Sequence, residues 1–292
     1  MLNPLSLDPA QAGAYANGIS NDGVIAGAEL PAGQPPVPGF WTVSGGAMLL
    51  TPYVYSAEAV AANDNGMIIG NEGGPGTVSS EPLVWAAPSY AETALPGLRC
   101  DHCDRINVTS SAINDDGMIV GSSEYSVYDS NDNYVTGGLH AVAWQNGSAT
   151  DLGALQGADT SAAYSVNGGG DIVGGSRASQ ASGAPTHAFL YHAGVMTDLG
   201  TLDGDSNSTA SSINDSGQIV GQSQSDTTTR AFLYQNGHMY DLNTLIDPAS
   251  APAGDLDLQQ AVGINTSGQI AVNGTDSRDP GWTRAFLLTP AH

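Results

Sequence analysis

The sequence predicts an all-β protein, a six-bladed β-propeller with four strands per blade. Three observations support this fold class. A strand–turn–strand phrase recurs six times, a second apolar phrase lies between its copies, and no helix-length amphipathic segment is visible. Successive copies are 43 to 53 residues apart. Four short strands repeated at such a period are typical of a propeller blade.

The first phrase predicts strands a and b of each blade. It consists of a small or apolar residue, a polar turn that contains Asn and ends in Gly, and an apolar run; its fifth copy, residues 213–221, reads INDSGQIVG. Asn, Asp and Gly tolerate the positive φ that a tight hairpin needs, so we expect strand a before the turn and strand b after it. The six turn glycines are Gly23, Gly66, Gly117, Gly170, Gly217 and Gly268.

The second phrase predicts strands c and d. Strand c is a short apolar run with aromatic residues, as in AFLY at 188–191 and 231–234. In repeats three to five a Gly turn follows, and then a strand that ends in Asp-Leu-x-x-Leu at 151–155, 198–202 and 241–245. Strands c and d therefore form a second tight hairpin in each unit.

The two ends of the sequence predict how the last blade is completed. The sixth repeat reaches strand c at 285–288 and has no strand d, whereas the chain begins with Leu2-Asn3-Pro4-Leu5, which matches the Leu-x-x-Leu end of strand d. We expect the N-terminal strand to complete the last blade, so that residues 1–292 form a single domain without an unpaired strand at the join. An open β-solenoid, the alternative, would have shorter repeats and terminal caps.

Composition limits the classes of partner. Acidic residues number 29 and basic residues six, all of them Arg, which gives a net charge of −23. Nucleic acid and anionic membrane surfaces are therefore poor partners. No apolar run of about 18 residues occurs, so we expect no membrane insertion. Met1 begins a segment without the basic and apolar regions of a signal peptide. We expect a monomer with an extracellular ligand.

One repeat carries a family resemblance. Residues 186–202 read THAFLYHAGVMTDLGTL, next to Ile-Asn-x-x-Gly and Val-Gly phrases. This pattern resembles the HAF-repeat family of bacterial extracellular proteins, which is named for the His-Ala-Phe triplet. The fifth repeat has Arg230 in the place of the His, and repeats one, two and six are diverged. The resemblance implies secretion or display on the cell surface, and it implies no particular activity.

The variable loops are where we expect a functional site. The b–c and d–a connections should share one face, and their lengths differ strongly: the b–c loop is short in repeat five, 222–229, and long in repeat three, 122–139. Binding residues concentrate on variable loops held by a rigid scaffold. Polar residues recur at the start of strand c, which favours a structural contact repeated in each blade over a catalytic one.

Two groups on these loops are candidate ligand-binding residues. Cationic or titratable residues gather after repeat two, where an Arg pair could hold an anionic sugar; neutralisation of Asp101 and Asp104 is the alternative. Aromatic residues on the repeat-three loop and before the last strand c could stack against sugar rings, or could pack their own loop onto its blade. The candidates are Arg99, His102, Arg105, Tyr125, Tyr128, Tyr134 and Trp282.

The d–a loop after repeat four is the candidate calcium site. Asp203, Asp205 and Asn207 alternate, a spacing that can present oxygen ligands to Ca²⁺, and backbone carbonyls, water or a neighbouring loop must then complete the coordination. An ordinary solvated turn is the alternative, because the distal bidentate Glu of a full calcium loop is missing. The segment 129–133 is a weaker second candidate.

Cys100 and Cys103 are the chain's two cysteines. We expect a local disulfide that closes an exposed loop. A redox Cys-x-x-Cys site normally begins a helix in a βαβ setting, and a zinc site would need a second matching pair of ligands.

Two functional hypotheses follow. The first is a secreted binding module that recognises carbohydrate on the variable-loop face, with calcium as its possible cofactor. The alternative is a polysaccharide-active enzyme, a lyase or a glycosidase, with its site at the mouth of the propeller. The sequence contains no nucleophile elbow, phosphate-binding loop or zinc-protease motif.

Overall fold

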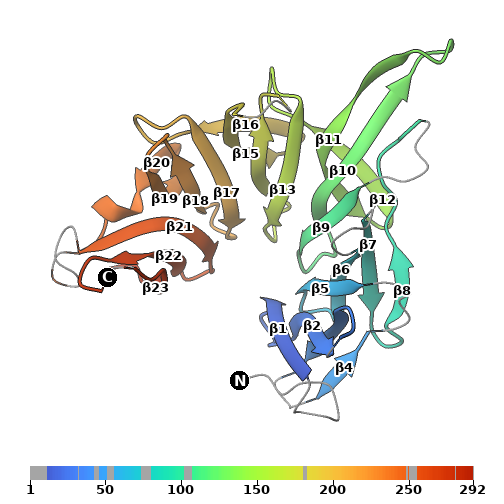
Figure 1. Ribbon diagram of the computed structural model, residues 1–292, viewed down its shortest axis with the longest axis horizontal. Helices are drawn as coiled ribbons and strands as arrows, with labels where there is room; N and C mark the ends of the chain where they lie inside the picture. Colours follow the sequence, from blue (N-terminus) through green and yellow to red (C-terminus); the bar gives the residue numbers. More distant parts are fainter. Residues whose placement is uncertain are drawn as a thin grey trace. The chain divides into compact units, whose positions relative to one another are not determined.

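The chain folds as a six-bladed β-propeller, which confirms the predicted fold class (Figure 1). The computed structural model describes residues 12–31, 33–42, 46–50, 56–73, 80–101, 107–179, 183–247, 249, 255–279 and 281–291. The chain comprises two compact units, Met1–Asp151 and Leu152–His292, each of which holds three blades. That the whole chain is one domain stays a prediction.

In the first unit each blade is a four-stranded antiparallel sheet. Blade one has the order β1-β2-β3-β4, blade two β5-β6-β7-β8, and blade three β9-β10-β11-β12. The strands are β1 (Ala12–Ile19), β2 (Ile25–Pro31), β3 (Val37–Trp41), β4 (Ala47–Leu49), β5 (Ala57–Ala62), β6 (Met67–Glu72), β7 (Glu81–Ala86), β8 (Ala91–Ala94), β9 (Val108–Ile113), β10 (Ile119–Tyr128), β11 (Tyr134–Gln145) and β12 (Ser148–Gly153).

In the second unit blades four and five are four-stranded, and blade six has three described strands. The elements are β13 (Thr160–Val166), β14 (Ile172–Arg177), β15 (Thr186–His192), β16 (Val195–Gly200), β17 (Asn207–Ile213), β18 (Ile219–Gln224), β19 (Thr229–Gln235), β20 (His238–Asp241), the 3₁₀ helix η1 (Leu242–Thr244), β21 (Leu256–Ile264), β22 (Ile270–Asp276) and β23 (Arg284–Leu288). The predicted closing strand at residues 2–5 lies outside the described residues, so the closure stays a prediction. Within the described ranges no helix has the length and hydropathy to cross a membrane.

The turns between strands a and b follow the prediction. All six turn glycines have positive φ, between 73° and 88°. In blade five the Gly217 N–H donates to the Asn214 carbonyl at 3.0 Å, and the Asn214 side-chain oxygen accepts from the N–H groups of Ser216 and Gln218 at 3.1 and 3.0 Å. Asn thus holds the turn through its side chain, and Gly supplies the left-handed residue that closes it.

A second repeated glycine, on strand b, has a steric origin. A Cβ added at Gly174 would lie 2.0 Å from the carbonyl oxygen of Ala162 on the neighbouring strand, and one at Gly121 would lie 1.8 Å from that of Thr109. The close approach occurs where strand a is bulged, for example between Ala163 and Ser165. The Val-Gly ending of the repeat therefore reflects a place where only a residue without a side chain fits.

The hydrophobic core lies between consecutive blades. In the first unit one cluster joins blades one and two around Phe40 and Trp85, and another joins blades two and three around Ile69 and Trp144. In the second unit a cluster that includes Phe232 joins blades four and five. Each sheet thus buries its apolar faces against its neighbours, as sheets packed face to face do.

Hydrogen bonds between the a–b turns also connect neighbouring blades. The Asn63 side chain donates to the Asn114 carbonyl at 2.9 Å in the first unit, and the Asn214 side chain donates to the Asn265 carbonyl at 3.0 Å in the second. Asn214 is 4% exposed. The recurring Asn therefore serves both its own turn and the next blade.

Candidate functional site

The most distinctive loop of the first unit is the hairpin of blade three. β10 and β11 have 10 and 12 residues, against six and seven for β14 and β15. β10 pairs with β9 only as far as Ser123, opposite Val108. Residues 124–139, which we name the outer hairpin, therefore extend past the rest of their sheet (Figure 1).

The loop that precedes β9 lies along the outer hairpin. The Asp101 N–H donates to the Ser126 carbonyl at 3.0 Å, and the Ser126 N–H donates to the Arg99 carbonyl at 3.2 Å. The Arg99 guanidinium donates to both carboxylate oxygens of Asp101, at 2.9 and 2.8 Å, and Asp101 also accepts from the Tyr128 N–H at 3.2 Å. A bidentate charged pair is thus fixed beside the aromatic residues.

Two of the three predicted aromatic residues come together on this hairpin. The ring of Tyr128 meets that of Tyr134 edge-on, with centroids 5.6 Å apart, and Tyr134 is 60% exposed. The Tyr125 ring lies 4.3 Å from the ring of His140 instead. Tyr128 and Tyr134 therefore form one aromatic pair, which Arg99 approaches through Asp101, and Tyr125 packs on strand c.

His140 belongs to a contact that recurs at the start of strand c. Its Nδ1 atom lies 2.9 Å from an oxygen of Asp151, and in blade four His187 lies 2.8 Å from Asp198 in the same way. In blade five Arg230 replaces the His and pairs with Asp241 at 3.2 Å. Each pair joins strand c to strand d. Because the contact recurs in three blades, it favours a structural role for these polar residues.

The outer hairpin ends in a turn that uses its own carboxylate. The Asp129 side chain accepts from the N–H groups of Asn131 and Asn133 at 2.8 and 2.9 Å and from the Asn133 side chain at 3.1 Å. These bonds, the side-chain bond first, lower the pKa of Asp129. The segment proposed as a second calcium loop thus holds its first carboxylate as a turn cap.

The remaining candidate ligand-binding residues are Trp282, His102 and Arg105. Trp282 precedes β23 in the second unit and is 72% exposed. His102, Cys103 and Arg105 lie outside the described residues, so their roles, including the disulfide with Cys100, stay predictions. The Cys100 sulfur lies 3.3 Å from the Ser126 hydroxyl, which places this cysteine against β10.

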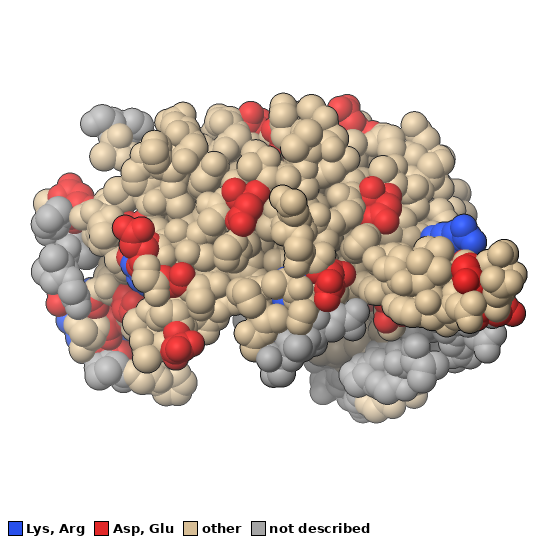
Figure 2. Space-filling view, turned by 90° about the horizontal axis from the view of Figure 1, so that it is seen from above, with Lys and Arg blue, Asp and Glu red and all other residues tan. Residues whose placement is uncertain are grey.

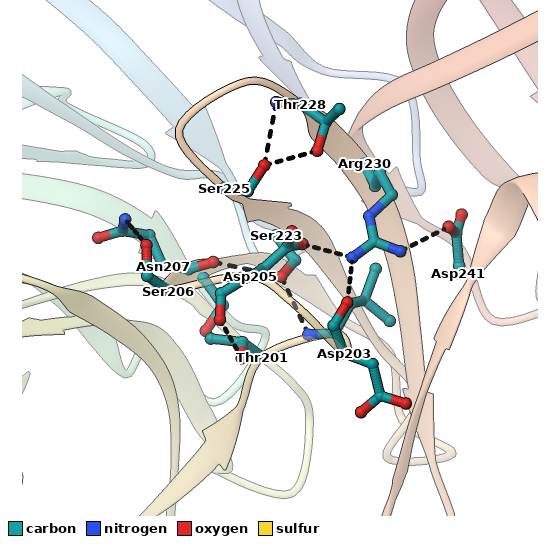
Figure 3. Close-up of polar contacts among 12 residues, drawn as sticks. Thr201, Asp203, Asp205, Ser206, Asn207, Ser223, Ser225, Thr228, Arg230 and Asp241 are labelled. Atoms are coloured by element: carbon teal, nitrogen blue, oxygen red, sulfur yellow. Dashed lines mark hydrogen bonds and ion pairs between the residues drawn. The ribbon is translucent and has the colours of Figure 1, made fainter.

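The predicted calcium ligands make other contacts. The Asp205 carboxylate, whose side chain is 2% exposed, lies 2.9 Å from Arg230 Nη2, and that same nitrogen donates to the Asp203 carbonyl at 2.9 Å (Figure 3). The Asn207 side-chain oxygen accepts from the Thr186 N–H at 3.0 Å. The Asp203 carboxylate points away from Arg230 and from Asn207 (Figure 3).

The three side chains therefore do not gather around one point, and calcium binding stays a prediction. Sequence reasoning noted Arg230 at the start of strand c and missed its contact with Asp205. The sequence offered only a weak signal of this contact, because Arg230 is one of six Arg residues and lies 25 positions after Asp205.

Blade two carries a carboxylate where blades three to five carry His140, His187 and Arg230. Glu81 stands at the start of its strand c, near Glu72 and Glu92. Burial, followed by the charges of Glu72 and Glu81, raises the pKa of Glu92; burial, followed by the charge of Glu81, raises that of Glu72. The Glu92 Oε2 atom is buried and has no hydrogen-bond partner among the described residues.

Replacing Glu92 by Gln should therefore raise the melting temperature by a few degrees at pH 7. Because the folded state raises the pKa of Glu92, the protonated carboxyl contributes stability below the ordinary pKa of about 4.5. That contribution is lost as the pH rises through the pKa of the folded state. The gain from the variant should shrink as the pH falls toward 4.5. Melting curves between neutral and acidic pH measure this, with the exposed turn residue Asp226→Asn as control. A gain that is independent of pH would contradict the expectation.

The charged side chains do not form one basic or acidic patch on the face in view. Acidic residues are spread singly over it, and Arg side chains appear in few places (Figure 2). No cluster of three or more His, Cys, Asp or Glu side chains suited to a metal ion occurs among the described residues. The outer hairpin combines one exposed aromatic ring, that of Tyr134, with the Arg99–Asp101 ion pair. Such a surface suits a neutral ligand.

The sequence matches one protein family. Residues 95–278, more than half of the chain, match the model of a family described as protein of unknown function (DUF3466). The matched segment begins just before the loop that lies along the outer hairpin and ends after β22. No curated protein matches the sequence.

Several solved structures resemble the chain. They include a prolyl endopeptidase, at 12% identity and a TM-score of 0.58 over 98% of this chain and 44% of that one. The acylaminoacyl peptidase of Pyrococcus horikoshii is similar at 11% identity and a TM-score of 0.56, over 94% of this chain and 43% of that one. A puromycin hydrolase is similar at 10% identity and a TM-score of 0.57, over 94% of this chain and 45% of that one. The chain spans less than half the length of each of the three, and at these identities the likeness concerns the fold alone.

Proposed function

We propose a function for this chain, which belongs to the DUF3466 family of proteins of unknown function: it is a binding module that recognises carbohydrate on the outer hairpin of blade three. The observation that carries this proposal is the exposed Tyr134 ring, held edge-on by Tyr128 at the side of the Arg99–Asp101 pair. All of these residues lie in the first unit.

The chemistry of this surface suits a sugar. A tyrosine ring is flat and apolar on its faces and polar at its hydroxyl, so it can stack against the C–H face of a pyranose. The Tyr134 hydroxyl donates to the Gly137 carbonyl at 3.3 Å, which restrains the ring before a ligand arrives. Restraint in the free protein reduces the entropy lost on binding. Arg99, whose side chain is 71% exposed, can direct further N–H groups to sugar hydroxyls.

A polysaccharide-active enzyme is the alternative, and the described residues give it less support. Tyr125, His140 and Asp151 form a set that could move a proton. The same His–Asp contact recurs at His187 and Asp198, where no tyrosine ring is paired with the histidine among the described contacts. A contact repeated in two blades is better explained by a structural role.

Two further expectations belong to this proposal. Extracellular location, which the resemblance to HAF repeats implies, would bring the hairpin to glycans of cell surfaces and matrices. Calcium would act as an additional ligand of the loop face, and binding measured with and without a chelator separates that contribution from the aromatic surface.

A glycan array followed by titration of the hits tests the proposal. Tyr134→Ala should weaken binding about tenfold, because the lost stacking and apolar contact amount to about 1.4 kcal/mol. Tyr134→Phe keeps the ring and should bind nearly as the wild type does. Tyr240→Ala removes a tyrosine that is 37% exposed in the second unit and serves as the matched control. An array without a reproducible hit, or equal affinities for Tyr134→Ala and the wild type, would overturn the proposal.

A further inference from the structure

The second unit contains a polar cavity between blades five and six. Its volume is about 560 Å³, within the range of sites for small molecules. It is lined by the threonines 227–229, by Arg230 and Asp241, and by Leu256, Asp257 and Gln259 from the first half of β21. None of these residues belongs to the outer hairpin.

The start of strand c is bonded differently one blade earlier, where strand a of the next blade accepts two hydrogen bonds from it. Between blades four and five, the Thr186 N–H donates to the Asn207 side chain at 3.0 Å, and the Ala188 N–H donates to the Ser208 hydroxyl at 2.8 Å. β17 and β21 pair with β18 and β22 in corresponding register, so Asp257 and Leu258 occupy the places of Asn207 and Ser208.

Neither replacement repeats these hydrogen bonds among the described contacts, although Leu258 is fully buried in the core. The Asp257 carboxylate accepts from the Gln259 side chain at 2.8 Å, and Leu258 has no acceptor in its side chain. The chain after β20 continues into η1, where Asn243, which also lines the cavity, exchanges hydrogen bonds with the backbone of Leu258 at 3.0 and 2.7 Å. The start of β19, Thr229 and Arg230, is left facing the cavity.

Arg230 is positioned as a fixed group of this cavity. Asp241 holds one terminal nitrogen at 3.2 Å, and the other lies 2.9 Å from both the Asp205 carboxylate and the Asp203 carbonyl (Figure 3). Asp205 contributes an ion pair, and the Arg230 Nε atom is buried without a hydrogen-bond partner among the described residues. The guanidinium is therefore held in place without being saturated.

The lining favours a neutral ligand that both donates and accepts hydrogen bonds. One Arg and two Asp leave the lining with a small negative charge inside a protein of net charge −23, so anions are disfavoured. Threonine hydroxyls and the Thr229 N–H offer donors, and Asp241 and Asp257 offer acceptors. Neighbouring hydroxyl groups of a sugar match such alternating partners, and Leu256 provides an apolar contact.

We propose that this cavity is a second ligand site, independent of the outer hairpin, which binds a neutral saccharide through two adjacent hydroxyl groups. One hydroxyl oxygen accepts from the Thr229 N–H, in the place that the Asn207 side chain takes one blade earlier. The other hydroxyl donates to Asp241 beside Arg230.

Amide NMR of the full chain tests this site. The isotope-labelled protein is titrated with the methyl glycosides of glucose, galactose, mannose and N-acetylglucosamine, and the Thr229 amide is followed. At least one glycoside should give a saturable shift with a dissociation constant of about 1 mM or below. Thr227→Tyr, which fills the cavity without touching the ion pairs, should abolish that shift. Asp226→Tyr introduces the same ring at the adjacent exposed position and should leave binding unchanged.

Two further variants make the outcome decisive. Arg230→His places in blade five the residue that blades three and four carry, and it should weaken binding at least about fivefold while the fold is kept. Tyr134→Ala should leave the Thr229 response intact, which separates this site from the proposed function. The inference is overturned if no glycoside shifts Thr229 saturably, if Thr227→Tyr binds as the wild type does, or if a tri-arginine peptide binds there and the glycosides do not.

Discussion

Replacing Gly174 by Ala should lower the stability of the second unit by about 3 kcal/mol or more, and its melting temperature by about 6 °C or more. The added Cβ would lie 2.0 Å from the Ala162 carbonyl oxygen and 2.9 Å from the Phe189 ring, in a core where neither neighbour has room to move. Strands β13 and β14 would have to separate at their bulge to admit it. Thermal unfolding followed by circular dichroism measures the change.

Gly263→Ala is the matched control for this experiment. Gly263 is also a strand residue next to a bulge, but nothing lies within 4 Å of the position that its Cβ would take. The control should leave the melting temperature unchanged or raise it slightly, because alanine reduces the entropy of the unfolded chain. Equal melting temperatures for the two variants would show that the close approach at Gly174 does not constrain the residue.

Asn214→Ala should cost about 2–4 kcal/mol. The variant removes two acceptor bonds within its own turn and the donor bond to the Asn265 carbonyl of the next blade, in a place where the residue is 4% exposed. The loss combines the side-chain bonds that hold the turn with the bond to the next blade, each of which contributes about 1 kcal/mol. Chemical denaturation of the full chain measures the loss.

Asn265→Ala separates the two roles of this Asn. The Asn265 side chain accepts from the N–H groups of Ser267 and Gln269, as that of Asn214 does in its turn. Asn265 is exposed, and its side-chain hydrogen bonds among the described residues stay within its own turn. Its loss should cost about 1 kcal/mol, the usual value for such a cap. If both variants lost the same stability, the bond between blades five and six would contribute nothing.

The repeat predicted the blades because its signals act over short distances. The turn glycines and the strand-b glycines each meet constraints set within one hairpin, as at Gly217 and at Gly174 with Ala162. The sheet order within each blade follows directly, because the a–b and c–d strands are joined by tight turns and consecutive strands usually lie side by side. The same reasoning named Tyr125, Tyr128 and Tyr134 as one group, since a single long loop holds them.

The polar contacts were harder to predict. The sequence grouped Asp203, Asp205 and Asn207 as oxygen ligands because they alternate along a loop. In the structure Asp205 meets Arg230 from a strand 25 positions later, and Asn207 meets the Thr186 N–H of the preceding blade. Alternation along a loop gives no information about the residues that the next strands bring close.

The sequence by itself thus determined the all-β class, the number of blades, the register of the tight turns and the place of the variable hairpin. Each of these depends on backbone conformation or apolar pattern within about one repeat, which is local information. Only the tertiary structure decided which Arg holds which Asp, and that a cavity lies beside Thr229. Those outcomes depend on what a neighbouring blade places against each strand end, where Asp257 and Leu258 stand in the places of Asn207 and Ser208 and do not repeat their hydrogen bonds among the described contacts.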